Sequence, residues 1–501
     1  MNKNSNKFKR SIIFFVILLL SFFLLNFFVA KKINSLIGSE LKEKGIEFKS
    51  KSSSNILLGN LSLSEVEIKK DSLFFKSKLI DIQGISYYKL LINNDISINS
   101  VIIKKPELSG KIANDTLKGK SEKNTINKKQ KGFKIHSLKV LNGTLNIEDI
   151  NSKKTEAKKI NITIKDIVLN DNKNSIIPFL YDDLNIEISD IKRKVSEIQE
   201  LNVGRIFIDN NLLVIDDLAL NPLKDESNYI KYVKEEKELI SLKIEKIKSS
   251  SFRVLPSDSM SVLTEKLDIS NMNFELFLDK THFSTSYKNK GLYSKVLREL
   301  PFHLQIKELG INNSKLIYKE LTDKEKAPGV LVFNDLNVSI KNIDNSKKNT
   351  TDTEFVLKAN FMNSSPLDVK YTFAINNLQD EFRIRGTLKN VTSKNMSSYI
   401  SPAMNVKMEG FINRMDFDFE GNNHVSNGEF NIDFKNFKVK ILNEERELDK
   451  ILSFLANIFV KDSAKDGMVK VKIEGVERDK TKSFWNFFWK NIEEGLKESL
   501  L

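Results

Sequence analysis

The feature that most constrains this chain is an uncharged run at residues 12–30, IIFFVILLLSFFLLNFFVA. As an α-helix this run would cover about 28 Å, close to the ~30 Å hydrocarbon core of a bilayer. A cleaved signal peptide is the alternative, but it needs a shorter apolar region and a small-x-small cleavage site. Phe28-Val29-Ala30 lacks the first small residue of such a site. We therefore expect an uncleaved transmembrane anchor at residues 12–30.

The charges on either side of this run predict its orientation. Residues 1–11 contain three lysines and one arginine and no acidic residue, whereas lysine and glutamate are mixed in residues 31–50. Positively charged flanks stay in the cytoplasm. No second run of this kind follows, so we expect a cytoplasmic tail at residues 1–11, one crossing, and the rest of the chain on the other side of the membrane.

Composition restricts the chemistry of the remaining 471 residues, which follow Ala30 in the 501-residue chain. The absence of cysteine excludes thiolate metal sites, thiol nucleophiles and disulfides. The net charge of +14 is partly local, because residues 111–134 hold eight lysines against two acidic residues. We interpret residues 109–133 as a polar, basic linker. Elsewhere the charges alternate in sign without a basic, aromatic-rich stripe, so no nucleic-acid partner is expected.

No catalytic or metal-binding constellation stands out. The four histidines are scattered without metal-ligand spacing, and the chain has no nucleotide-binding glycine loop or nucleophile elbow. Asp416, Asp418 and Glu420 followed by Gly421 resemble the start of a calcium loop, but the twelfth position is Asn427 instead of glutamate. We expect no enzyme activity, no cofactor, no metal and no catalytic residue.

Alternating apolar residues indicate β-strands through most of the chain. In residues 31–108 the period-two pairs slip by one residue in places, which predicts antiparallel strands with bulges and one apolar face. These pairs are Leu61 and Leu63, Val66 and Ile68, Ile80 and Ile82, Ile96 and Ile98, and Val101 and Ile103. Similar patterns continue through residues 134–443, so we expect some 20–25 strands in total.

Residues 134–443 also contain diverged repeats. Residues 136–170 and 307–344 share one form, in which two alternating runs flank an asparagine-containing turn and a third run follows a polar gap. Asn142-Gly143 is a favoured pair for a two-residue hairpin turn, and it lies between two such runs. We therefore predict a repeating β-structure in which short strands are joined at these asparagines.

Helices are expected at few places. Residues 226–239 are highly charged, and the spacing of Leu292, Val296 and Leu300 within residues 287–300 predicts a helix that covers an edge of the sheet. Residues 444–501 are predicted to form a helix, a strand and a second, amphipathic helix. The aromatic residues of this last helix allow two interpretations: packing on the sheet, or contact with a membrane interface. The membrane-interface candidates are Phe484, Trp485, Phe488 and Trp489.

The predicted strands have more apolar surface than the few predicted helices can cover. Either two sheets pack face to face, or one long sheet curls and its apolar side lines a groove. The second arrangement needs a hydrophobic occupant, and the membrane anchor favours acyl chains. The candidate groove residues are Ile162, Ile164, Val338, Ile340, Phe373, Ile375, Phe417, Phe419, Phe430, Ile432 and Phe434. We expect aspartate at Phe417 or Ile432 to release a bound lipid.

Both ends of the chain resemble the AsmA-like family of Gram-negative envelope proteins. The N-terminal anchor is followed by GNLSLSEVEIKKDSLFFKSKLIDIQG, ISYYKLLINNDISINSVIIKKPEL and a polar linker, as in that family. MEGFINRMDFDFEGNNHVSNGEFNIDFKNFKVKIL, LDKILSFLANIFV and KSFWNFFWKNIEEGL are similar to the closing part of its Bacteroidetes-type members. The resemblance rests on patterns of alternation and covers the middle of the chain only in style.

This resemblance implies an inner-membrane anchor and an elongated, curved, mostly antiparallel β-groove in the periplasm, related to bridge-like lipid-transfer proteins. Phospholipids would be the ligands, in outer-membrane lipid homeostasis, and outer-membrane or envelope assembly proteins are further candidate partners. The family offers no catalytic residues to assign. The alternative function is a scaffold for outer-membrane protein biogenesis that binds polypeptide through exposed strand edges.

Overall fold

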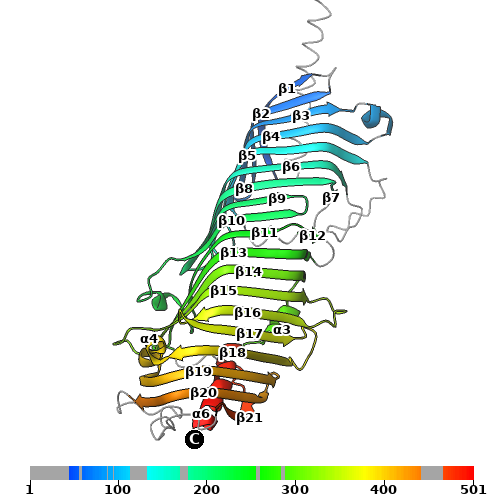
Figure 1. The fold of residues 1–501 in the computed structure, drawn as a ribbon. Coiled ribbons are helices and arrows are strands. Elements are labelled where there is room, and N and C mark those ends of the chain that lie inside the picture. The colour runs from blue at the N-terminus through cyan, green and yellow to red at the C-terminus, as the bar shows by residue number, and fades with distance from the viewer. Residues whose placement is uncertain are drawn as a thin grey trace, which may run out of the picture. The chain divides into compact units, whose positions relative to one another are not determined.

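The computed structural model describes residues 45–55, 59–86, 88–93, 95–112, 132–169, 179–255, 260–283, 288–441 and 467–500 (Figure 1). The predicted tail, the anchor at residues 12–30, most of the linker and the apolar helix pattern of residues 448–459 lie outside these ranges. Within them, no helix combines the length and the apolar character needed to cross a membrane.

The described part of the chain is mainly β-structure, as predicted, and its 21 strands belong to one mixed sheet that does not close on itself. The strands are β1 (Glu47–Asn55), β2 (Asn60–Lys70), β3 (Leu73–Ile85), β4 (Ile96–Lys111), β5 (Phe133–Glu148), β6 (Lys154–Leu169), β7 (Phe179–Leu180), β8 (Asp183–Lys194), β9 (Gln199–Asp209), β10 (Leu212–Pro222), β11 (Leu239–Ser249), β12 (Arg253–Leu255), β13 (Ser261–Asp279), β14 (His303–Leu321), β15 (Gly329–Asp344), β16 (Thr353–Phe361), β17 (Ser365–Phe373), β18 (Phe382–Thr392), β19 (Val406–Gly421), β20 (Val425–Ile441) and β21 (Val469–Glu477).

Few helices interrupt the described strands. They are a π-helix η1 (Lys89–Asn93), a 3-10 helix η2 (Tyr229–Tyr232), and the α-helices α3 (Tyr293–Arg298), α4 (Ser393–Met404) and α6 (Phe484–Leu500). The predicted helix at residues 287–300 is shorter than expected, and the charged stretch at residues 226–239 contributes only η2. Helix α4 was not predicted. Its N-cap Thr392 accepts a hydrogen bond from the Asn395 amide, but Ser and Asn within the helix hide its periodicity.

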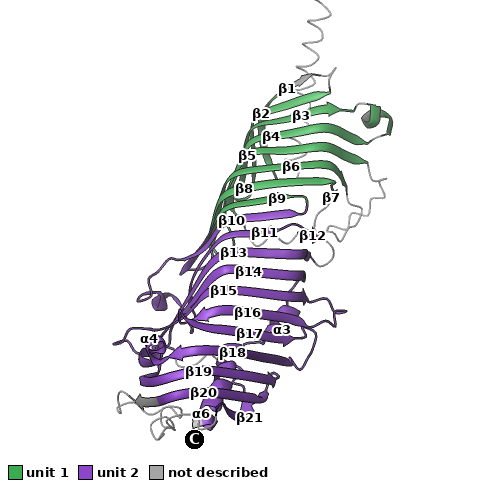
Figure 2. Cartoon of the chain, in the orientation of Figure 1, with its two compact units in different colours: residues 1–194, 203–210 green, residues 195–202, 211–501 purple. Residues whose placement is uncertain are grey.

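The chain divides into two compact units (Figure 2). Unit 1 consists of residues 1–194 and 203–210, and unit 2 of residues 195–202 and 211–501. Among the described residues of unit 1, η1 is the one helical element, whereas η2, α3, α4 and α6 all belong to unit 2. In the described parts of the chain, the two units therefore differ in how much helix accompanies their strands.

Sequential strands pair antiparallel in most cases, but β4 pairs with β5 and β13 pairs with β14 in parallel. Two consecutive strands can be parallel only if their connection returns along the length of the strand. The connection from Asp279 to His303 does so and carries α3, whose neighbour Leu292 and its own Leu297 pack on the apolar face of the sheet. Between β13 and β14, the predicted antiparallel order is thus interrupted by a segment that packs on this face.

The predicted hairpin turn at Asn142-Gly143 is wrong. Both residues lie inside the 16-residue strand β5, at a shift in its register with β6. Asn142 adopts a φ of 54°, which asparagine tolerates in a β-bulge as well as in a turn. One long bulged strand therefore replaces the two short strands that we predicted. The corresponding turn in residues 307–344 is also a bulge, at Asn313 in the 19-residue β14.

Bulges of this kind line up across neighbouring strands of unit 2. Asn271 in β13 and Asn313 in β14 both have positive φ angles, and their side chains are joined by a hydrogen bond of 2.7 Å. The Asn313 amide then donates to the Asn337 side chain of β15, at 3.1 Å. Each bulge inserts one residue, so the alternation of apolar side chains can slip by one position and resume on the same face.

Candidate functional site: the apolar face of the sheet

The apolar face of unit 1 is built from side chains in register on six strands. Cross-strand partners in a ladder point to the same face, so each chain of partners is a row of neighbouring side chains. The first row is Leu63, Ile80, Ile103, Val140, Ile162 and Ile186. The second row is Leu61, Ile82, Val101, Leu138, Ile164 and Leu184. Two aliphatic rows thus cross β2, β3, β4, β5, β6 and β8.

The opposite face of the same strands is polar. The residues between the two aliphatic rows form a row of their own, and only one of the six is aliphatic. This row is Ser62, Asp81, Ile102, Lys139, Thr163 and Asn185. Ser62 donates a 2.5 Å hydrogen bond to Asp81 within it. Each of these six strands therefore separates an aliphatic face from a polar one.

Burial differs along the aliphatic rows of unit 1. Leu61, Leu63 and Val66 are buried in a small cluster with side chains of β1 and β3. Further along the first row, Ile103, Val140 and Ile162 are only half-buried, although their partners on the adjacent strands are also aliphatic. In the described residues of this unit no α-helix is present to cover them.

The same two-faced pattern continues in unit 2. One row of the apolar face is Ile215, Ile247, Ile269, Ile311, Val338, Leu357, Val369, Gly386, Phe417, Phe430 and Val471. The adjacent row on the other face is Lys248, Asp268, Gly310, Ser339, Val356, Lys370, Arg385, Asp418, Glu429 and Lys472. Arg383 binds Asp418 there through two hydrogen bonds of 2.7 Å. One face of this unit thus has an apolar row over eleven strands, and the other has a row in which most residues are charged.

Helix α6 covers the C-terminal end of this apolar face (Figure 1). The Phe484 ring lies 4.9 Å from Tyr371 of β17 and 5.3 Å from Phe382 of β18, measured between ring centroids. A Cβ placed on Gly495 would come within 2.3 Å of the Phe430 side chain, so glycine permits the close approach of helix and strand. The helix and these strands together form the largest hydrophobic core of the described residues.

Buried polar groups hold the helical cover in place. The Arg298 guanidinium in α3 lies 2.8 Å from the Asp380 carboxylate, which is only 4% exposed, and Ser294 donates to the same oxygen at 2.8 Å. Arg478, between β21 and α6, donates to the Lys290 carbonyl and to Asn423. Its Nε has no partner, and burial lowers the pKa of this guanidinium. These contacts join α3 to the β17–β18 turn, and the segment before α3 to the end of β21 and the β19–β20 turn.

The predicted groove residues all lie within the apolar regions of the two units. Ile162 and Ile164 belong to the aliphatic rows of unit 1, and Val338 and Ile340 lie on β15 of unit 2. The other seven belong to the core that includes α6. They are Phe373, Ile375, Phe417, Phe419, Phe430, Ile432 and Phe434. For this second group, the chain's own helices supply the packing that the sequence pattern had led us to expect from a ligand.

The C-terminal helix packs on the sheet, which is the first of the two interpretations above. Among the membrane-interface candidates, Phe484 is 5% exposed and Phe488 packs on Phe417, with 5.1 Å between ring centroids. By contrast, Trp485 and Trp489 are 51% and 37% exposed. Two of the four candidate side chains therefore point into the protein and two point away from its core.

Sequence reasoning missed the residues that fasten this cover. Asp380, Arg298 and Arg478 are far apart in the chain, and no motif relates them. Tyr293, at the start of α3, was missed for the same reason, because its neighbours Tyr371 and Phe484 come from β17 and α6. Arg298 lies among mostly apolar residues, but Asp380 and Arg478 lie among polar ones, so no local signal identifies these partners.

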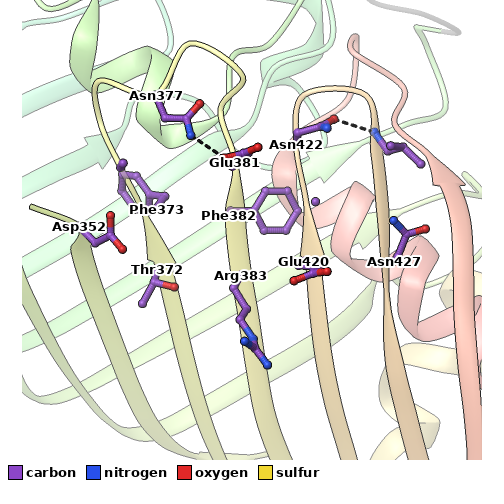
Figure 3. A pocket seen from close by; sticks show the side chains of 13 residues that line it. Asp352, Thr372, Phe373, Asn377, Glu381, Phe382, Arg383, Glu420, Asn422 and Asn427 are labelled. Carbon is purple, nitrogen blue, oxygen red and sulfur yellow. Dashed lines mark hydrogen bonds between the residues drawn. The ribbon is translucent and has the colours of Figure 1, made fainter. Parts of the chain in front are cut away.

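A shallow cleft lies at the edge of the sheet where β17 and β19 end and β18 and β20 begin. Figure 3 shows its lining. Phe373 and Phe382 form part of it, together with Asn377, Glu381 and Glu420. The Asn377 amide donates to the Glu381 carboxylate at 2.8 Å. The polar groups there stabilise the turns that they belong to, and the cleft provides no arrangement that we can assign to a reaction.

The acidic sequence that resembled a calcium loop is part of strand β19. Asp416 accepts a 2.6 Å hydrogen bond from Thr387 and a 2.7 Å bond from Arg414. Burial would raise the pKa of Asp416, but these bonds outweigh it and lower the pKa. Across the described ranges, no group of three or more His, Cys, Asp or Glu side chains is arranged to hold a metal ion.

Comparison with known proteins adds no relative to this picture. The chain matches no protein-family model, and the search of curated proteins gives no match either.

Proposed function

We propose that the protein holds phospholipid acyl chains against the apolar face of its sheet and leaves the head groups in water. The observation that carries this proposal is the half-buried aliphatic surface of unit 1. Ile103, Val140 and Ile162 are aligned in neighbouring strands with polar residues on the opposite face. Each methylene group that such a surface removes from water contributes roughly 0.8 kcal/mol.

The size of this surface suits an acyl chain. Strands lie about 4.8 Å apart, so six neighbouring strands cover about 24 Å between the first and the last. The hydrocarbon region of one bilayer leaflet is about 15 Å, half of the ~30 Å core. An acyl chain that lies across the strands can therefore contact aliphatic side chains along its whole length.

The polar opposite face supports the same function. A sheet packed on both sides would need apolar residues on both faces, as buried sheets have. Here the opposite face of unit 1 carries Asp81, Lys139 and Asn185, and that of unit 2 carries ion pairs. The protein is thus suited to keep one face in water while an apolar ligand occupies the other.

In this proposal the sheet is the elongated, curved groove of an AsmA-like protein. It follows an inner-membrane anchor at residues 12–30, lies in the periplasm and takes part in outer-membrane lipid homeostasis. The resemblance supports this assignment through the same strand patterns that form β2 to β4 and β19 and β20. The aligned bulges support curvature, because each bulge bends its strand.

Photo-crosslinking in cells tests the proposal with the full chain. A photoreactive phenylalanine is placed at Ile103 or Ile162 on the apolar face, and at Ile102 or Thr163 on the polar face as matched controls. All four positions are half-buried and lie on the same two strands. After growth in radioactive phosphate, we expect at least about tenfold more labelled lipid on the protein from the apolar-face positions, because two or more methylene contacts suffice for that ratio.

Two results would overturn the proposal. Equal labelling from both faces would mean that the apolar face has no preference for lipid. Crosslinks from Ile103 and Ile162 to polypeptide in place of phospholipid would favour the alternative, a scaffold for outer-membrane protein assembly.

A further inference from the structure

Helix α6 crosses the strands obliquely, so its two ends lie over different parts of unit 2. Phe484, at its start, contacts β17 and β18, and Phe488 contacts Phe417 of β19. Gly495, near its end, approaches Phe430 of β20. The start of α6 is therefore the end nearest to β10–β16. In this part of the apolar row Val338 is buried, and the other five residues are half-buried: Ile215, Ile247, Ile269, Ile311 and Leu357.

Exposed aromatic side chains gather at this start of the helix. Trp485 is 51% exposed, Trp489 37% and Tyr293 of α3 41%. They adjoin the core, because the Trp485 ring lies 6.2 Å from Phe488 and the Tyr293 ring 5.8 Å from Phe484.

We propose that Tyr293, Trp485 and Trp489 form an end wall for the acyl chain, where the half-buried part of the apolar face in unit 2 meets its helical cover. This inference rests on the proposed function and adds residues that would contact the ligand. The wall is a binding surface for phospholipid that already lies on the sheet.

The composition of the wall suits this role. A patch of large exposed apolar side chains marks an interaction site in many soluble proteins. Tyrosine and tryptophan combine an apolar ring with one polar group, which allows contact with a methylene chain and a hydrogen bond to an ester or phosphate oxygen. The chain has two tryptophans, and both lie in this wall. Tryptophan is also enriched at bilayer surfaces, so direct membrane contact is the competing explanation.

Continuity with the sheet favours a lipid held by the protein over a bilayer surface. Trp485 connects through Phe488 to Phe417, and Tyr293 packs on Tyr371 with 6.2 Å between ring centroids. Phe417 and Tyr371 point to the same face as Val338 and Leu357. A chain that follows the apolar row toward β17 would therefore meet the two exposed aromatic rings without leaving the apolar surface.

The test uses the full chain in cells, with a photoreactive phenylalanine at Trp485 and radioactive phosphate as the lipid label. A second substitution is then added in β16, where Leu357 and Val356 are adjacent and half-buried but face opposite sides. Leu357→Asp places a carboxylate on the apolar row, and Val356→Asp places one on the polar face. We expect Leu357→Asp to lower lipid crosslinking at Trp485 by at least about tenfold and Val356→Asp to leave it unchanged, because an unpaired carboxylate in an apolar contact costs several kcal/mol.

The outcomes separate this inference from the proposed function. Crosslinking at Trp485 that survives both Leu357→Asp and an equivalent Ile311→Asp would show that lipid arrives from a bilayer, and would overturn the end wall. The end wall would also be overturned if a probe at Ile103 gave lipid crosslinks and a probe at Trp485 gave none. If neither position gave lipid crosslinks, the proposed function itself would be contradicted. Limited proteolysis of each variant identifies loss of folding, and a probe at the exposed Glu498 of α6 should give only background labelling.

Discussion

Unit 1 and the C-terminal end of unit 2 are built from the same kind of strand but differ in what covers them. In unit 1 Ile103, Val140 and Ile162 are half-buried, and no α-helix is present among the described residues. At the end of unit 2, Phe419, Phe430 and Phe434 are fully buried beneath helical cover. The same alternation therefore leaves a half-buried apolar surface in one place and forms a hydrophobic core in the other, where helices among the described residues pack on the strands.

This difference changes how one expectation drawn from the sequence can be tested. We predicted that aspartate at Phe417 or Ile432 would release a bound lipid. Both residues belong to the core that α6 completes, with exposures of 5% and 1%. A carboxylate there would disrupt packing of the protein itself, so tests of lipid binding belong at half-buried positions such as Ile103 and Leu357.

The largest effect expected from this contrast is on stability. Phe430→Ala should lower the free energy of unfolding by about 3–5 kcal/mol, because it leaves a cavity between β20 and α6. Ile103→Ala in lipid-free protein should cost only about 1–2 kcal/mol, because its side chain is half-buried. Both changes in the free energy of unfolding are measured by urea titration, with amide hydrogen exchange as the readout for each unit. Similar losses at the two positions would contradict the difference in cover.

The next effect concerns the fastening of α3. Arg298→Ala removes the partner of a carboxylate that is only 4% exposed, and we expect a loss of about 3 kcal/mol, at the lower end of the range for breaking a buried ion pair. Amide exchange in residues 293–298 should rise accordingly. Lys295→Ala is the control, because it breaks the exposed pair between this residue of α3 and Glu299, the C-cap of the helix. Unchanged exchange in Arg298→Ala would show that packing alone holds α3.

A smaller effect should follow from the aligned bulges. Asn313 has a φ of 50°, and a residue with a plain Cβ pays roughly 1–2 kcal/mol in this conformation. We expect Asn313→Ala to lower the melting temperature more than Asn313→Gly does, although both variants lose the hydrogen bond to Asn271. Asn312→Ala, one residue away, serves as the reference. If alanine and glycine behave alike, the side-chain bond and not the backbone conformation sustains the bulge.

The smallest effect should come from the charged face. Arg383 and Asp418 form a bidentate pair, but their side chains are 55% and 35% exposed. Exposed pairs contribute about 0–1 kcal/mol, so Arg383→Ala should change the urea midpoint little and leave lipid crosslinking from Ile103 unaltered. A large loss of either would mean that this face takes part in binding.

The amount that could be predicted varied with the range of the interaction. Period-two alternation predicted the β-structure and its bulges. It also predicted that the eleven candidate residues lie on apolar faces of strands, because these properties depend on a few adjacent positions. It misassigned Asn142-Gly143, since asparagine with positive φ serves a turn and a bulge equally well. The pairing of Arg298 with Asp380 spans 82 residues, and no local pattern encodes it.

The sequence by itself determined that this protein has strands with one apolar and one polar side, because apolar and polar residues alternate along each strand and successive side chains point to opposite faces. Which apolar residues are covered was decided only by tertiary structure. The return of the chain between β13 and β14 places α3 on the sheet, and Gly495 lets α6 approach Phe430 closely. Burial depends on which distant segment occupies the space above a strand, and the alternation within the strand is the same in either case.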